Sequence, residues 1–74
     1  MNLPPIQRRM LDLLADGIVH THDQLRHCAD DPDMINGTLY VNIKKLKDTL
    51  RKYTHFDIVS YRGEGYRLVR LVMD

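Results

Sequence analysis

The sequence predicts a mainly α-helical domain of three helices that ends in a β-hairpin. Three observations predict it: two short stretches with helical spacing of apolar residues, a long amphipathic stretch over 36–53, and strand-like spacing after residue 54. The 74 residues suffice for one small domain covering 1–74. A chain of this length buries only about 60% of its unfolded surface, so most of its large apolar side chains are needed for the core.

The first helix is predicted over residues 5–16. Ile6, Met10 and Leu14 recur at helical spacing, and the preceding prolines suit a first helical turn. Gly17 is the expected terminating residue just past the last turn. The next three residues, 18–20, are long enough only for a brief strand.

The second helix is predicted from His22 to about residue 29. Thr21 and Gln24 have the spacing of a capping box, in which each side chain bonds the other residue's backbone N–H. This short helix should bury Leu25 and Cys28.

A loop with three aspartates and Pro32 follows over residues 30–33, since proline cannot simply continue the helix. We expect Met34 and Ile35 to attach this loop to the core. Asn36 is a suitable N-cap for the third helix.

The third helix, predicted over about 36–53, is the element that the rest of the chain serves. Its apolar residues Leu39, Ile43, Leu46 and Leu50 recur at steps of four, three and four, which places them on one stripe. Five basic residues and one acid lie within residues 36–53, a local charge of +4, whereas residues 21–35 sum to −3. The chain is therefore a dipole whose positive end lies on one helix, although an ordinary amphipathic surface helix would have the same periodicity.

The residues after the third helix predict a β-hairpin. A first strand is expected over 55–60 and a second over 66–72, joined by a turn in which Gly63 and Gly65 can take positive φ. Helix, short strand, helix, acidic loop, long basic helix and hairpin is the order of a winged helix-turn-helix. In that arrangement the hairpin, or wing, flanks the exposed face of the third helix.

Two segments also resemble a known family. Residues 38–50 (TLYVNIKKLKDTL) and 60–68 (SYRGEGYRL) resemble the C-terminal DNA-binding domain of OmpR/PhoB-type response regulators. That family has a helix like TVDVHIRRLRxKL followed by a hairpin containing RGxGYR. The resemblance covers about residues 4–70, and the RGxGYR match is its most specific part.

The resemblance implies a third helix in the major groove and a hairpin on the adjacent backbone. It implies groove contacts from Val41, Asn42 and Lys45, and phosphate contacts from Thr38, Lys44, Lys47, Ser60 and Tyr66, with Arg62 in or beside the minor groove. The side-chain chemistry agrees with these roles. Asn pairs with adenine, Lys with guanine acceptors and Val with the thymine methyl, whereas hydroxyls and lysines bind phosphate.

The sequence departs from the family at several places. Gly37 stands where the family usually has a phosphate-binding arginine, and lysines replace arginines, which lowers the expected affinity or base discrimination. Glu64 at the wing tip would repel phosphates unless it points outward. The family's N-terminal sheet and its phosphate-receiving domain have no counterpart in this chain, so regulation by phosphorylation is not expected.

Other chemistries are less well supported by the sequence. His20, His22, His27 and Cys28 are close in sequence but lack the tight, recurring spacing of zinc ligands, so we expect solvated histidines, a core cysteine and no metal or cofactor. No pair of carboxylates has catalytic spacing, and no feature indicates a nucleophile with its base, so we expect no enzyme. Tyr40, Tyr53 and Tyr61 are expected to lie partly in the core.

The prediction is thus a sequence-specific double-stranded DNA-binding protein that regulates transcription, cytoplasmic and associated with the nucleoid when bound. Its single cysteine fits a reducing compartment, and no apolar run could cross a membrane. A dimer or tandem copies are expected, with residues 68–73 and the outer flank of the first helix as candidate contacts. The alternative is a winged-helix protein–protein interaction module, with RNA polymerase or another regulator as its partner.

Overall fold

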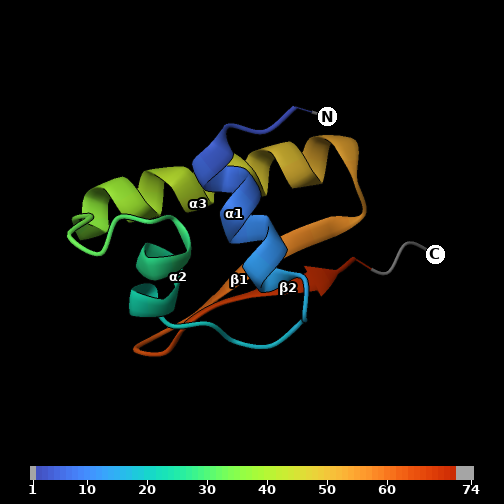
Figure 1. The fold of residues 1–74 in the computed structure, drawn as a ribbon. Coiled ribbons are helices and arrows are strands. Elements are labelled where there is room, and N and C mark those ends of the chain that lie inside the picture. The colour runs from blue at the N-terminus through green and yellow to red at the C-terminus, as the bar shows by residue number, and fades with distance from the viewer. Residues whose placement is uncertain (1, 72–74) are drawn as a thin grey trace.

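The computed structural model describes residues 2–71, which form three helices and a two-stranded antiparallel sheet. The elements are α1 (Pro5–Leu14), α2 (His22–Cys28), α3 (Asn36–Tyr53), β1 (Phe56–Tyr61) and β2 (Gly65–Arg70). After α3 the chain turns back, so that the hairpin runs beneath α3 toward α2 (Figure 1). The predicted order of three helices and a C-terminal hairpin is confirmed.

Helix α1 ends two residues earlier than predicted. Ala15 is its C-cap, and residues 15–16 form a turn instead of continuing the helix. Gly17, at φ 78°, closes this turn because its N–H donates to the carbonyl of Leu14 at 3.1 Å. The expected role of Gly17 is therefore confirmed, and only the position of the last helical residue is wrong.

The brief strand expected at 18–20 is reduced to one bridging residue. His20 pairs with Tyr66 of β2 through two hydrogen bonds, one from the N–H of His20 to the carbonyl of Tyr66 (2.8 Å) and one in the reverse direction (2.9 Å). This bridge attaches the segment between α1 and α2 to the hairpin.

Helix α2 begins with the predicted capping box. The N–H of Gln24 donates to Thr21 Oγ1 at 3.1 Å, and the N–H of Thr21 donates to Gln24 Oε1 at 3.0 Å. Leu25 is fully buried as expected, whereas Cys28 is only half-buried, with its thiol donating to the Leu25 carbonyl. Partial burial raises the pKa of the Cys28 thiol, so it stays protonated and weakly reactive at neutral pH.

The connection between α2 and α3 differs from the prediction at two residues. Met34 is buried, but Ile35 is 70% exposed and does not pack on the core. Asn36 is the first helical residue and not the cap, because its Oδ1 accepts a hydrogen bond from Arg26 Nη2. Arg26 also donates from Nε to the carbonyl of Met34 at 2.7 Å, so one largely buried guanidinium ties α2 to the start of α3.

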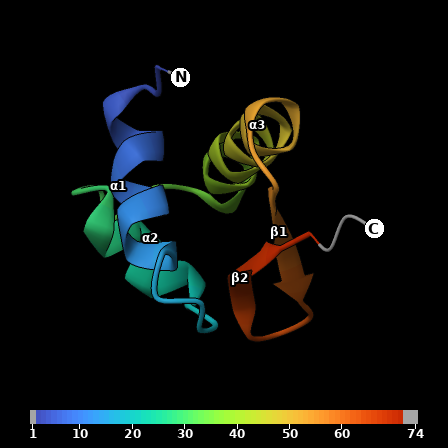
Figure 2. The same cartoon turned by 90° about the vertical axis from the view of Figure 1, so that its right-hand side faces the viewer.

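The core lies between the three helices and the inner face of the hairpin. The predicted stripe of α3 is confirmed, since all four residues are at most 3% exposed: Leu39, Ile43, Leu46 and Leu50. Met10 and Leu14 of α1 and Leu25 of α2 meet this stripe from one side, and Ile58 of β1 meets it from the other. Figure 2 shows α3 nearly end-on, with the hairpin below it and α1 beside it.

The hairpin is shifted slightly from its predicted bounds. β1 begins and ends one residue later than expected, and β2 ends at Arg70, with Val72 and Met73 outside the described residues. The register pairs Ser60 with Tyr66 and Ile58 with Leu68. Leu68, the first residue of the proposed dimer contact, is half-buried against the protein's own core.

None of the helices within residues 2–71 is long and apolar enough to cross a membrane.

Candidate nucleic-acid interface

The side of α3 that faces away from the core carries most of the predicted site residues. Thr38, Val41, Lys44 and Lys45 are all exposed, with Val41 at 46%. At 100° per residue, Val41 lies near the middle of this face, Lys44 toward the hairpin and Lys45 toward the opposite edge. No described residue forms an ion pair with Lys44 or Lys45. The front of α3 is therefore uncovered and cationic.

Asn42 is placed on the edge of α3 that lies away from the hairpin. It is half-buried, and its Nδ2 donates to the carbonyl of Thr38 at 3.0 Å. The carboxamide is therefore folded back onto the helix. To present a donor and an acceptor to a base, Asn42 must change rotamer and give up this hydrogen bond.

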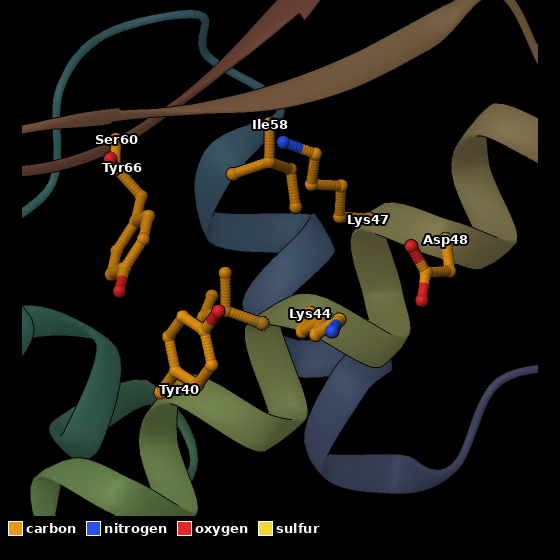
Figure 3. Close-up of a pocket in the computed structure, with 8 residues that line it drawn as sticks. Tyr40, Lys44, Lys47, Asp48, Ile58, Ser60 and Tyr66 are labelled. Atoms are coloured by element: carbon orange, nitrogen blue, oxygen red, sulfur yellow. The ribbon is translucent and has the colours of Figure 1, made fainter.

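A recess between α3 and the hairpin brings four of the predicted residues together. Lys44 and Lys47 from α3 and Ser60 and Tyr66 from the hairpin all line it. Its apolar floor includes the buried residues Ile43 and Ile58, and its volume is about 250 Å³. Figure 3 shows these side chains converging from the helix and from the two strands.

Tyr66 is the residue that links the hairpin most closely to the helices. Its backbone forms the bridge to His20, and its ring lies edge-on to the ring of His22, with centroids 5.4 Å apart at an interplanar angle of 81°. Burial raises the pKa of the Tyr66 phenol, and the neighbouring Tyr40 adds to this shift. The hydroxyl therefore remains protonated and able to donate a hydrogen bond at neutral pH.

Two acidic side chains reduce the positive charge near the recess. Lys47 Nζ lies 3.9 Å from Asp57 Oδ1, so part of the Lys47 charge is balanced within the protein. Asp48 lines the recess and is exposed. Lys44 is the lysine of the recess with no acidic partner among residues 2–71.

The tip of the hairpin lies beside the starts of α2 and α3. Gly63 and Glu64 line a shallow recess with Thr21, His22, Asp23, Arg26 and Asn36. Arg62 is exposed in the turn between β1 and β2. Four predicted residues thus lie on the side of α3 that faces the hairpin: Lys44, Lys47, Ser60 and Tyr66. Asn42 and Lys45 lie toward the other edge of α3, and Arg62 does not line the recess between α3 and the hairpin.

The environment of His20 differs from the one that the sequence predicts. His20 was expected to be solvated but is 5% exposed, with Nε2 at 2.8 Å from Asp16 Oδ2 and Nδ1 at 3.2 Å from Gln24 Oε1. A hydrogen bond from the Ile18 N–H, followed by that from His20, lowers the pKa of Asp16. The side chains that surround His20 therefore hold the α1–α2 connection in place.

Metal ligation has no support in the described residues. Within residues 2–71, no three His, Cys, Asp or Glu side chains are grouped as a metal site requires.

Tyr40 lines the recess although it is not among the residues predicted to contact DNA. Tyr40 and Tyr53 were expected to be partly buried but are 57% and 62% exposed. Tyr40 lines the recess with Lys44 and Tyr66, whereas Tyr53 lies at the opposite end of α3. The available signal was the spacing of Tyr40, four residues before Lys44, which places both on the same edge of the helix.

Comparison of the sequence with models of known protein families found no match, and comparison with curated proteins found none either.

Proposed function

We propose that this protein is a sequence-specific double-stranded DNA-binding protein of the winged helix-turn-helix type, and that it regulates transcription. In this proposal α3 enters the major groove and the hairpin lies on the adjacent backbone, with Arg62 at the minor groove. The observation that supports it best is the recess in which Lys44 and Lys47 of α3 meet Ser60 and Tyr66 of the hairpin. Because helix and hairpin present donors to the same space, one phosphate backbone can contact both.

The exposed middle of α3 supplies the groups for base recognition. Val41 can pack on a thymine methyl group, and Lys45 can donate to the acceptor atoms of guanine. Asn42 can pair with adenine after it leaves its hydrogen bond with the Thr38 carbonyl. Thr38, exposed in the first turn of α3, is placed to bind a backbone phosphate.

The charges of this surface predict a marked salt dependence. Four cations are assigned to DNA contact: Lys44, Lys45, Lys47 and Arg62. If each of these cations displaces about one counterion from the DNA, the slope of log affinity against log salt is about −4. One module with so few contacts binds weakly, so we expect two or more copies on repeated half-sites.

A titration of labelled duplex DNA tests the proposal. The double variant Lys45→Ala, Arg62→Ala should lose about 10- to 100-fold in affinity and about two units of salt slope. The control is Arg8→Ala, Arg9→Ala, which removes the same charge from exposed positions of α1. Equal losses in both double variants would show that only net charge matters. Absence of binding by the wild-type protein at about 50 mM salt would refute the proposal.

A protein–protein interaction module is the second candidate function, and one observation favours it. Ile35 is 70% exposed, lies two residues after the acidic loop over 30–33 and does not pack on the core. In this candidate function Ile35 would insert into an apolar site on the partner, beside polar contacts made by the acidic loop. If the wild-type protein binds no duplex, this candidate becomes the leading one.

A further inference from the structure

Tyr40 is the aromatic residue of the recess that the proposed function leaves unused. It lies one helical turn before Lys44 on the edge of α3 that faces the hairpin. At 57% exposure its ring contributes little to the core. Figure 3 shows the Tyr40 ring directed into the same space as the ring of Tyr66, from the opposite wall of the recess.

The hydroxyl groups around this recess are free of hydrogen bonds to the described part of the chain. Among residues 2–71, no hydrogen bond is made by the side-chain oxygen of Tyr40, Ser60 or Tyr66. Burial, with a smaller contribution from Tyr40, raises the pKa of the Tyr66 phenol. A tyrosine hydroxyl donates a hydrogen bond without carrying a positive charge.

These donors surround a space that suits an anionic oxygen group. Two phenol hydroxyls, the Ser60 hydroxyl and the Lys44 ammonium line the recess, which is open to solvent and about 250 Å³ in volume. A phosphodiester has two non-bridging oxygens that share one negative charge, and each oxygen accepts several hydrogen bonds. Hydroxyls and ammonium groups are common phosphate ligands. The carboxylate of Asp48 on the rim repels anions, and this repulsion grows with the negative charge of the ligand. A singly charged group such as a phosphodiester is therefore favoured over a more highly charged anion.

We propose that Tyr40 is a further DNA-contacting residue, whose hydroxyl binds the same backbone phosphate as the hydroxyl of Tyr66. This inference rests on the proposed function. It adds Tyr40 as the residue that links the DNA contacts of α3 to those of the hairpin. A phosphate held from both walls of the recess fixes the position of the hairpin relative to the major groove. Because a hydroxyl group donates a hydrogen bond without bringing a positive charge to the DNA, this contact adds affinity without releasing additional counterions.

The test compares single substitutions in a fluorescence anisotropy titration with a duplex of about 20 base pairs of random sequence. Tyr40→Phe should lower affinity about 10- to 100-fold, because it removes one hydrogen bond to a charged group, and it should leave the salt slope unchanged. Lys44→Gln should lower affinity and also reduce the slope by about one. Tyr53→Phe is the matched control, since Tyr53 is equally exposed on α3 but lies far from the recess. It should bind as the wild type does.

Each outcome separates this inference from the proposed function. If Tyr40→Phe binds as tightly as Tyr53→Phe while Lys45→Ala, Arg62→Ala weakens binding, the inference is overturned and the proposed function stands. If only Tyr40→Ala weakens binding, the ring and not the hydroxyl is used, which also overturns it. If the wild-type protein binds no duplex, both fail. Urea unfolding of Tyr40→Phe, expected to match the wild type, checks that the fold is intact.

Discussion

Gly65 is the residue at which the attachment of the hairpin can be tested most sharply. Its φ is 154°, and a Cβ built there would lie 1.8 Å from the carbonyl oxygen of His20. Gly65→Ala should therefore open the bridge between His20 and Tyr66, which consists of two backbone hydrogen bonds. Their net loss amounts to about 1–3 kcal/mol. The disfavoured backbone conformation adds about 1–3 kcal/mol.

The expected loss in the free energy of unfolding is thus about 2–6 kcal/mol, from a total that for a domain of this size is about 4–11 kcal/mol. Urea unfolding followed by circular dichroism measures it. Gly63→Ala is the control: Gly63 has φ 76°, but no atom lies within 4 Å of its built Cβ. That variant should lose only about 1–2 kcal/mol. If Gly65→Ala costs no more than Gly63→Ala, the close approach to His20 does not determine stability, and the reasoning is refuted.

Three further predictions follow from individual contacts. Asp48→Asn should tighten duplex binding about 2- to 5-fold, because it removes a negative charge from the recess, whereas Asp12→Asn on α1 should not. Arg26→Lys should cost about 2–3 kcal/mol in urea unfolding, since lysine cannot make the three hydrogen bonds of the guanidinium, and an unchanged midpoint would contradict this. The lowered pKa of Asp16 means that its contribution to stability is complete above its unfolded pKa of about 4 and is lost as the pH falls through the folded value. The stability difference between wild type and Asp16→Asn should therefore shrink as the pH falls below about 4, and a constant difference would count against the hydrogen bonds from the Ile18 N–H and from His20.

The parts of the fold that sequence predicts correctly are those decided by local interactions. The capping box of α2 involves residues three positions apart, and the buried stripe of α3 follows from helical periodicity alone. Asn36 was assigned wrongly as a cap because its partner, Arg26, comes from another helix. His20 was assigned wrongly as solvated because its burial depends on the bridge to Tyr66, 46 positions along the chain.

In the candidate site too, the sequence predicts only the features that depend on local interactions. Exposure of Lys44 and Lys45 follows from the position of the buried stripe on α3. The meeting of Lys44 with Ser60 and Tyr66 depends on how the hairpin packs, and periodicity does not predict that contact. The resemblance to a known family suggested the hairpin residues but not Tyr40, because the matching position of that family's helix is an aspartate.

Tyr66 shows why stability and the proposed binding are coupled in so small a domain. Its backbone holds the hairpin to the α1–α2 segment, its ring contacts His22, and its hydroxyl faces the recess. A ligand held between Tyr66 and Tyr40 would connect the hairpin to α3 where, among residues 2–71, neither phenol hydroxyl forms a hydrogen bond. Because such a ligand binds the folded state alone, it should raise the free energy of unfolding by an amount that grows with the ratio of ligand concentration to Kd. DNA binding and the attachment of the hairpin would therefore both depend on Tyr66.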